Sequence, residues 1–90
     1  MTPTINANGT NSDVLCKTYG AATDAVRDAI RMVCDIAPVP RDYPTNKDWS
    51  AANLAHARMV VALAKIRDEL EETEVQILDQ VLDQKKFAAA

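Results

Sequence analysis

Three side chains in this 90-residue sequence are of the types that catalysis and metal binding use most often: His56, Cys16 and Cys34. A general base needs a partner that positions it, and a metal ion needs several ligands. His56 is the only histidine, and helical spacing puts it on an apolar seam between Asn53, one turn before, and Val60, one turn after. We interpret it as a core histidine, hydrogen-bonded near a helical hairpin. A buried pH-sensitive position is the alternative.

The two cysteines are too far apart to form a disulfide. Eighteen positions of one predicted helix separate them, which at the standard rise corresponds to about 27 Å. A disulfide requires Cα atoms within about 7 Å of each other. We expect two free thiols that act as small apolar side chains, in a reducing compartment. The N-terminus lacks the basic and apolar regions of a signal peptide, so we predict a cytoplasmic protein.

Acidic residues gather between Asp68 and Asp83. This run lacks the alternating ligand spacing and the central glycine of a calcium loop. We interpret it as a solvated face, and a surface that receives a basic protein is the alternative. The sequence also lacks a glycine-rich phosphate loop, a Gly-x-Ser-x-Gly elbow and a His-Glu-x-x-His pair. We predict a protein without catalytic residues, metal site or cofactor.

The net charge of −3 argues against one broad class of partner. Five basic and five acidic residues precede Asp48, and five basic and eight acidic residues follow from there on. A protein that binds phosphate backbones needs clustered lysine and arginine, so we expect no nucleic-acid partner. The longest apolar stretch, residues 59–64, is far too short to span a bilayer. We expect no membrane partner either.

The elements that carry these residues are predicted to be helices. Residues 1–11 are polar and are expected to form a flexible tail, and Asn11 or Ser12 can cap a first helix over residues 12–36. Apolar or small side chains recur there at alternating spacings of four and three, which predicts one narrow buried seam. The seam consists of Leu15, Tyr19, Ala22, Val26, Ala29, Val33 and Ile36. Pro38 ends the helix, because proline disfavours helical geometry in the residue before it.

A second helix is predicted after a stiff connector with three prolines, residues 38–44. Thr45 or Asn46 can cap this helix, and its apolar spacings again alternate between three and four. Its predicted seam consists of Trp49, Ala52, His56, Met59, Leu63, Ile66 and Leu70. Two matching seams joined by a short rigid loop predict an all-α fold, an antiparallel helical hairpin of two long helices.

The second helix is predicted to be longer than the first. We expect it to continue without a break to residue 87, and the alternative is a break at Thr73 followed by a short third helix. Residues 12–87 then form one domain, and residues 88–90 a tail. A first helix of about 25 residues covers roughly two-thirds of a second one of about 38. Aliphatic side chains from residue 75 onward would then stay unshielded, at a cost of about 1.5–3 kcal/mol for each.

We therefore predict a homo-oligomer, a dimer or larger, in which helical hairpins assemble into a bundle and cover this surface. Leu54 and Val61 lie off the seam and give the second helix a further apolar side. The predicted interface consists of Leu54, Val61, Val75, Ile77, Leu78, Val81, Leu82 and Phe87. The leading hypothesis is a non-catalytic protein–protein interaction module: an adaptor, inhibitor or assembly component that also binds an unidentified protein.

A small-ligand binder is the second hypothesis. Its pocket would form between protomers and take a nucleotide-like anion, with Lys17, Tyr19 and Arg58 as candidate binding residues. Arg41 and Tyr43 lie on the stiff connector, and a rigid loop loses little entropy when it binds. They are candidate recognition residues for either hypothesis.

One architectural resemblance can be stated. The short tail, the two antiparallel helices and the loop that leads into residues 47–53 resemble phage-encoded hairpin proteins that oligomerise and sequester cyclic-nucleotide immune signals. The resemblance covers about a third of the chain and stops at Leu54-Ala55, where that family has a lysine-threonine pair. A likeness of this kind concerns architecture and not activity.

Overall fold

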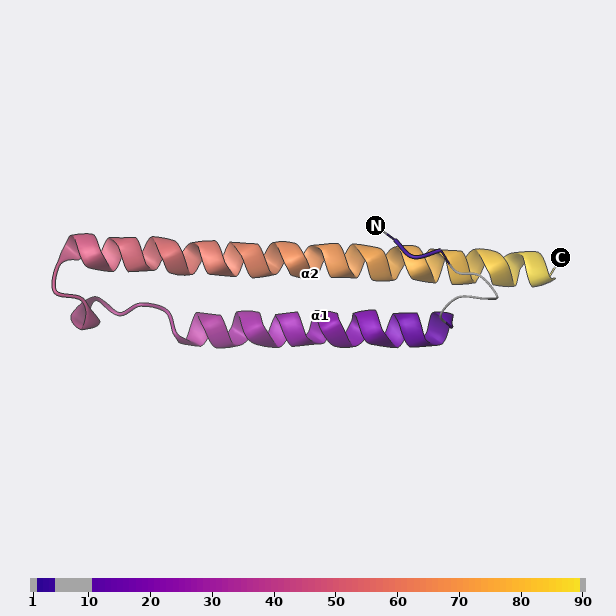
Figure 1. The fold of residues 1–90 in the computed structure, drawn as a ribbon, viewed down its shortest axis with the longest axis horizontal. Coiled ribbons are helices and arrows are strands. Elements are labelled where there is room, and N and C mark those ends of the chain that lie inside the picture. The colour runs from indigo at the N-terminus through magenta and orange to yellow at the C-terminus, as the bar shows by residue number, and fades with distance from the viewer. Residues whose placement is uncertain (1, 5–10, 90) are drawn as a thin grey trace. The chain divides into compact units, whose positions relative to one another are not determined.

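The chain folds into two long helices joined by a short connector. The computed structural model describes residues 2–4 and 11–89, the last four of these by their backbone alone. Helix α1 spans Ser12–Asp35, the short 3₁₀ helix η1 spans Pro40–Asp42, and α2 spans Asn46–Ala89 (Figure 1). The described part of the chain contains no strand. The prediction of an all-α helical hairpin is confirmed.

Each long helix begins at a side chain that accepts a hydrogen bond from the first helical turn. The Asn11 Oδ1 accepts from the backbone N–H of Asp13 at 2.7 Å, and the Thr45 Oγ1 accepts from the backbone N–H of Asp48 at 3.0 Å. The N–H groups of a first turn have no partner within their helix, so such caps contribute about 1 kcal/mol each. Asn11 and Thr45 were both among the predicted caps.

Helix α1 ends in a tightened turn just before the prolines. The N–H of Ile36 donates to the carbonyl of Val33 at 3.2 Å, three residues earlier, and such a bond narrows the last turn. Pro38 follows two residues later, so α1 ends at Asp35, one residue earlier than predicted. The connector then makes one tight turn of its own, η1.

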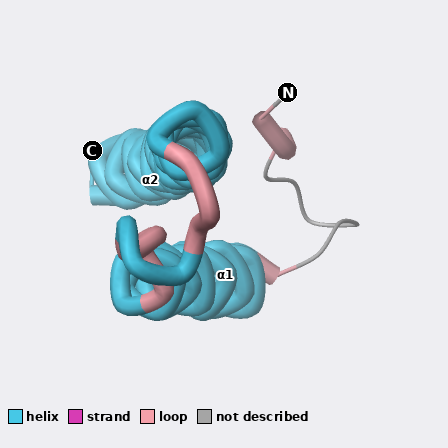
Figure 2. The backbone as a smooth tube through the Cα atoms, turned by 90° about the vertical axis from the view of Figure 1, so that its left-hand side faces the viewer, coloured by secondary structure: helices cyan, strands magenta, loops and turns pink. Residues whose placement is uncertain are grey.

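The chain forms two compact units, and each contains a stretch of both long helices. The connector unit is Ala25–Arg67, which includes the second half of α1, the connector and the first half of α2. The terminal unit is Met1–Asp24 with Asp68–Ala90, which includes the first half of α1 and the second half of α2. Within each unit the two helical stretches lie side by side and run in opposite directions (Figure 1, Figure 2).

Helix α2 passes through Thr73 without interruption, so the alternative of a third helix is wrong. The Thr73 Oγ1 donates to the carbonyl of Glu69, four residues earlier, at 3.0 Å. This is the bond of a threonine inside a helix and not that of a cap. The favoured prediction of one continuous second helix is confirmed, and α2 ends at Ala89, two residues beyond the predicted end.

The predicted seam of α1 is confirmed over most of its length. From Leu15 to Val33, each predicted seam residue is half-buried. Ile36 lies beyond the end of the helix and is exposed, so its place on the seam is wrong. Thr23 beside the seam is buried, and its hydroxyl donates to the carbonyl of Tyr19 at 2.9 Å. The buried hydroxyl is therefore paired within its own helix.

The seam of α2 follows a different register from the predicted one after His56. Val60 and Arg67 are half-buried, whereas Met59 and Ile66, predicted for the seam, are exposed. The observed seam takes two steps of four in succession, from Ala52 to His56 to Val60, and then alternates in the opposite order to the prediction, so that it still includes Leu63 and Leu70. An α-helix has 3.6 residues per turn, so a seam along a straight neighbour needs steps of four more often than steps of three.

The overhang of α2 beyond α1 is shorter than predicted: within the terminal unit α2 extends past the start of α1 (Figure 1), but Ile77 is buried and not unshielded. His56, ten residues after the start of α2, is hydrogen-bonded to the carbonyl of Val33 near the end of α1. The prediction assumed that the two helices pair directly after the loop. In the structure the first residues of α2 lie beyond the end of α1, so α1 pairs with a part of α2 farther along the chain. In the terminal unit, a Cβ added to Gly20 of α1 would lie 3.8 Å from the Glu74 Oε1. This part of α2 therefore has a helical neighbour.

Candidate functional site

The candidate site is a row of exposed aliphatic side chains on α2, which we refer to as the α2 stripe. It consists of Leu54, Val61, Val75, Leu78 and Leu82, all predicted for the interface. The exposed fraction is 53% for Leu54, 68% for Val61, 54% for Val75 and 62% for Leu82. These four are separated by multiples of seven residues. A helix returns to nearly the same direction after seven residues, so the four share one side of α2.

The α2 stripe points away from the seam on which each unit packs. Seam residues follow stripe residues by two positions, as His56 follows Leu54 and Ile77 follows Val75. Two positions correspond to about 200° around a helix, so the members of each pair point in nearly opposite directions. The stripe is therefore exposed because of the direction in which it points, and not because α2 lacks a neighbour.

Three residues of the predicted interface do not belong to the α2 stripe. Ile77 is fully buried, with 0% of its surface exposed, so the prediction that it is unshielded is wrong. Val81 is half-buried. Both lie on the seam, four residues apart, where the predicted overhang would have left them in water. The side chain of Phe87 lies outside the described residues.

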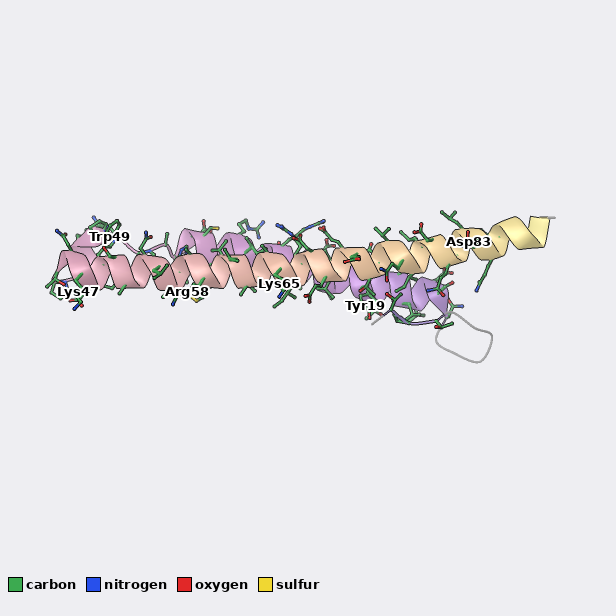
Figure 3. All side chains as sticks on the ribbon, turned by 90° about the horizontal axis from the view of Figure 1, so that it is seen from above. Tyr19, Lys47, Trp49, Arg58, Lys65 and Asp83 are labelled. Carbon is green, nitrogen blue, oxygen red and sulfur yellow. The ribbon has the colours of Figure 1, made fainter. Side chains whose placement is uncertain are left out.

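Charged side chains flank the α2 stripe in a row of their own, which we refer to as the charged row. It consists of Arg58, Lys65, Glu72 and Asp79, which follow one another every seven residues and are all exposed. Figure 3 labels Arg58 and Lys65 on α2. Residues four apart are neighbours on a helix surface, and Arg58 and Lys65 follow stripe residues by four. The row is basic in the connector unit and acidic in the terminal unit.

His56 lies on the seam, as predicted. Its Nε2 is 2.6 Å from the carbonyl oxygen of Val33. A carbonyl can only accept, so the Nε2–H of His56 donates. Val33 carries one of the last carbonyls of α1, which have no partner four residues ahead in the helix. The interpretation of His56 as a hydrogen-bonded core histidine is confirmed.

The residues predicted to bind a small ligand belong to two different units. Lys17 and Tyr19 lie in the terminal unit, and Arg41, Tyr43 and Arg58 lie in the connector unit. The three basic residues are exposed and the two tyrosines are half-buried. A ligand pocket between protomers stays a prediction.

Sequence reasoning missed several contacts in the terminal unit. The Thr2 hydroxyl donates to the side-chain carbonyl of Gln76, and the Gln80 Nε2 donates to the backbone carbonyl of Pro3 at 2.9 Å. Glu74 was assigned to a solvated acidic face but is half-buried on the seam. The predicted alternation of three and four continues from Leu70 to Thr73 and Ile77 and so misses Glu74, which only a step of four from Leu70 reaches. No signal in the sequence points to the contacts of Thr2 and Pro3.

Several familiar kinds of site are not found in the described residues. Cys16 and Cys34 are free thiols, and no described group of histidine, cysteine, aspartate and glutamate side chains is suited to hold a metal ion. Neither described helix contains an apolar stretch that could span a membrane.

No family model, no curated protein and no solved structure matches the chain. Its function has therefore to be inferred from its own residues.

Proposed function

We propose that this protein is a non-catalytic protein–protein interaction module that works as a homo-oligomer of helical hairpins. The balance between buried and exposed apolar side chains supports this proposal. Among the described residues, Ile77 is the one buried hydrophobic residue, whereas eleven large apolar side chains are exposed. Burying one such side chain contributes about 1.5–3 kcal/mol, and a whole domain is stable by only about 5–15 kcal/mol. A hairpin with so small a core therefore gains much from a partner.

Another helix is the partner that fits the α2 stripe. A narrow row of aliphatic side chains at seven-residue spacing, with charged residues along one side, is typical of a surface on which a helix packs. A helix with apolar residues on two sides is typical of an assembly in which it has more than one neighbour. In this proposal the seam of α2 packs within its own chain, and the α2 stripe packs against another protein chain.

The same proposal covers the setting in which the protein acts. The protein serves as an adaptor, inhibitor or assembly component in the cytoplasm, where the thiols of Cys16 and Cys34 stay reduced. It binds neither nucleic acid nor a membrane. Beyond itself, its partner is a protein that uses the assembled hairpins as a docking surface.

Sedimentation equilibrium from low to high micromolar concentration tests the proposal. We expect the mass to rise with concentration to at least twice the 9.8 kDa of one chain. In Val61→Lys, a charge in the middle of the apolar contact should lower the assembled mass to that of one chain. Val14→Lys is the matched control, because Val14 is also exposed but lies on α1. Wild-type protein that stays monomeric at high micromolar concentration would contradict the proposal.

A further inference from the structure

The charges of α2 are divided between its two halves. Residues 46–67 include four basic residues and one acidic residue, and residues 68–89 include seven acidic residues and two basic ones. The α2 stripe is apolar in both halves, with Asp68 at the seven-residue position between Val61 and Val75. A helix with opposite charges toward its two ends discriminates between the two directions in which a copy of itself can pack on it.

Parallel packing of α2 on the α2 of a second copy would bring like charges together. In a parallel pair in register, each position lies beside the same position of the other chain. Arg58 and Lys65 would meet the basic half of the second copy, and Glu72 and Asp79 would meet its acidic half. Like charges placed across a helical interface destabilise it. The exposed charged row therefore opposes this arrangement.

Antiparallel packing centred near Asp68 brings opposite charges together instead. Arg58 of one copy then lies beside Asp79 of the other, and Lys65 lies beside Glu72. From the first pair to the second, the position moves seven residues forward in one copy and seven residues back in the other. A single antiparallel register therefore forms both pairs, and two-fold symmetry forms each of them twice.

The apolar residues agree with this register. It places Val61 of one copy in the same layer as Leu78 of the other, and Ala57 in the same layer as Leu82, as alternating core positions of antiparallel helices require. Ala57 is exposed, and a small side chain opposite a leucine lets two helices approach closely. Asp68 at the centre leaves the apolar contact concentrated in the two ends of the stripe.

We infer that α2 binds the α2 of a second copy of this chain in antiparallel orientation, through the α2 stripe and the charged row. The inference rests on the proposed function and specifies its partner surface, orientation and residues. The basic part of the charged row in the connector unit of one copy contacts the acidic part in the terminal unit of the other.

Charge reversal tests the pairing. In Arg58→Glu/Lys65→Glu and in Glu72→Lys/Asp79→Lys, each of the four pairs becomes a pair of like charges. We expect the dimer dissociation constant at low salt to rise at least about tenfold in each double variant. The first variant makes the chain more acidic and the second makes it less acidic, so a general charge effect would move the two dissociation constants in opposite directions.

The quadruple variant Arg58→Glu/Lys65→Glu/Glu72→Lys/Asp79→Lys restores opposite charges only in an antiparallel pair. We expect its dissociation constant to return to within about threefold of the wild-type value. Circular dichroism of each variant checks that the helices are intact. An oligomer that none of these variants weakens, or a quadruple variant as weak as the doubles, would overturn the inference while leaving the proposed function in place. A monomeric wild-type chain would overturn both.

Disulfide trapping tests the orientation directly. Chains carrying Val61→Cys and chains carrying Leu78→Cys, both with Cys16→Ser and Cys34→Ser, are mixed in equal amounts and oxidised. Because a disulfide needs close Cα atoms, antiparallel packing predicts that the mixed disulfide exceeds either homodimeric one in mass spectra. A predominant disulfide between two Val61→Cys chains would indicate parallel packing and would overturn the inference.

Discussion

Replacement of His56 by alanine should destabilise the hairpin by about 1 kcal/mol. The change removes the hydrogen bond from Nε2 to the carbonyl of Val33, at 2.6 Å, and such a bond contributes a net 0.5–1.5 kcal/mol, roughly. Loss of the half-buried ring adds a comparable amount through lost packing. Alanine has a higher helix propensity than histidine, and this difference offsets up to about 0.6 kcal/mol of the lost stability. For a domain of this size, a change of about 1 kcal/mol corresponds to a decrease in Tm of about 4–8 °C.

Asn53→Ala is the matched control for this substitution. Asn53 is exposed on the same helix, and asparagine and histidine have similar helix propensities. The control therefore reports the gain in propensity alone, and we expect it to raise Tm slightly. His56→Phe is a second comparison, because it keeps a ring on the seam but has no donor for the carbonyl of Val33.

Thermal unfolding followed by far-UV circular dichroism measures the three variants. All samples need the same protein concentration, because assembly shifts Tm by mass action. We expect Tm to fall in His56→Ala relative to Asn53→Ala, and to fall less in His56→Phe. Equal stability of His56→Ala and Asn53→Ala would refute the reasoning, because the bond to Val33 would then contribute nothing.

Three further substitutions have expected effects on the free energy of unfolding, which urea denaturation measures. Ile77→Ala removes the fully buried isoleucine and should cost about 2–4 kcal/mol. Its control is Ile66→Ala, at a position 46% exposed on the same helix, which should cost about 1 kcal/mol or less. Equal costs of the two substitutions would contradict the observed register of the α2 seam. Gly20→Ala should stabilise α1 by about 0.8–1 kcal/mol, because the new Cβ would make an ordinary contact at 3.8 Å with Glu74; a loss of stability would show that this contact is tighter. Trp49→Phe should cost less than about 1 kcal/mol, because it removes an indole N–H that is buried without a partner among the described residues. An unpaired buried N–H itself costs about 1–3 kcal/mol, which its removal recovers. A cost of Trp49→Phe above about 1 kcal/mol would show that the N–H is paired.

The features of the fold that depend on neighbouring residues could be predicted from the sequence. Asn11 and Thr45 cap their helices through bonds to residues two and three positions away, so the residue types at the start of each helix are sufficient. The seam of α1 follows from spacing alone, and Pro38 fixes the end of that helix within one residue.

The pairing of the two helices could not be predicted in the same way. It depends on how far the connector extends before Val33 and His56 meet, and local spacing carries no information about that length. The error in the overhang, and with it the exposure predicted for Ile77, follows from this single unknown. The register of the α2 seam failed for a different reason: the prediction took a step of three after His56, where the helical repeat required a step of four. The charges of Arg67 and Glu74, both half-buried on the seam, concealed the correct register farther along α2.

The candidate site was predicted in part, and for a reason that differs from the observed one. Leu54 and Val61 were chosen because they lie off the seam, and the structure exposes both. Val75, Leu78 and Leu82 were chosen as parts of an overhang, but they are exposed because they point away from the seam. The charged row was not recognised, although the seven-residue spacing of its charges along a helix predicted to be continuous was a signal for it.

The distribution of apolar residues on α2 connects folding to assembly. Large aliphatic side chains occupy both the seam and the α2 stripe, while α1 covers only the seam. Arg67 and Glu74 take seam positions in the middle of α2 and limit the apolar surface that one chain can bury there. A chain that was selected to fold alone would place its aliphatic residues on the covered side and its charges on the other. In this chain a second copy can bury what α1 cannot reach, so association should supply part of the stability of the hairpin itself.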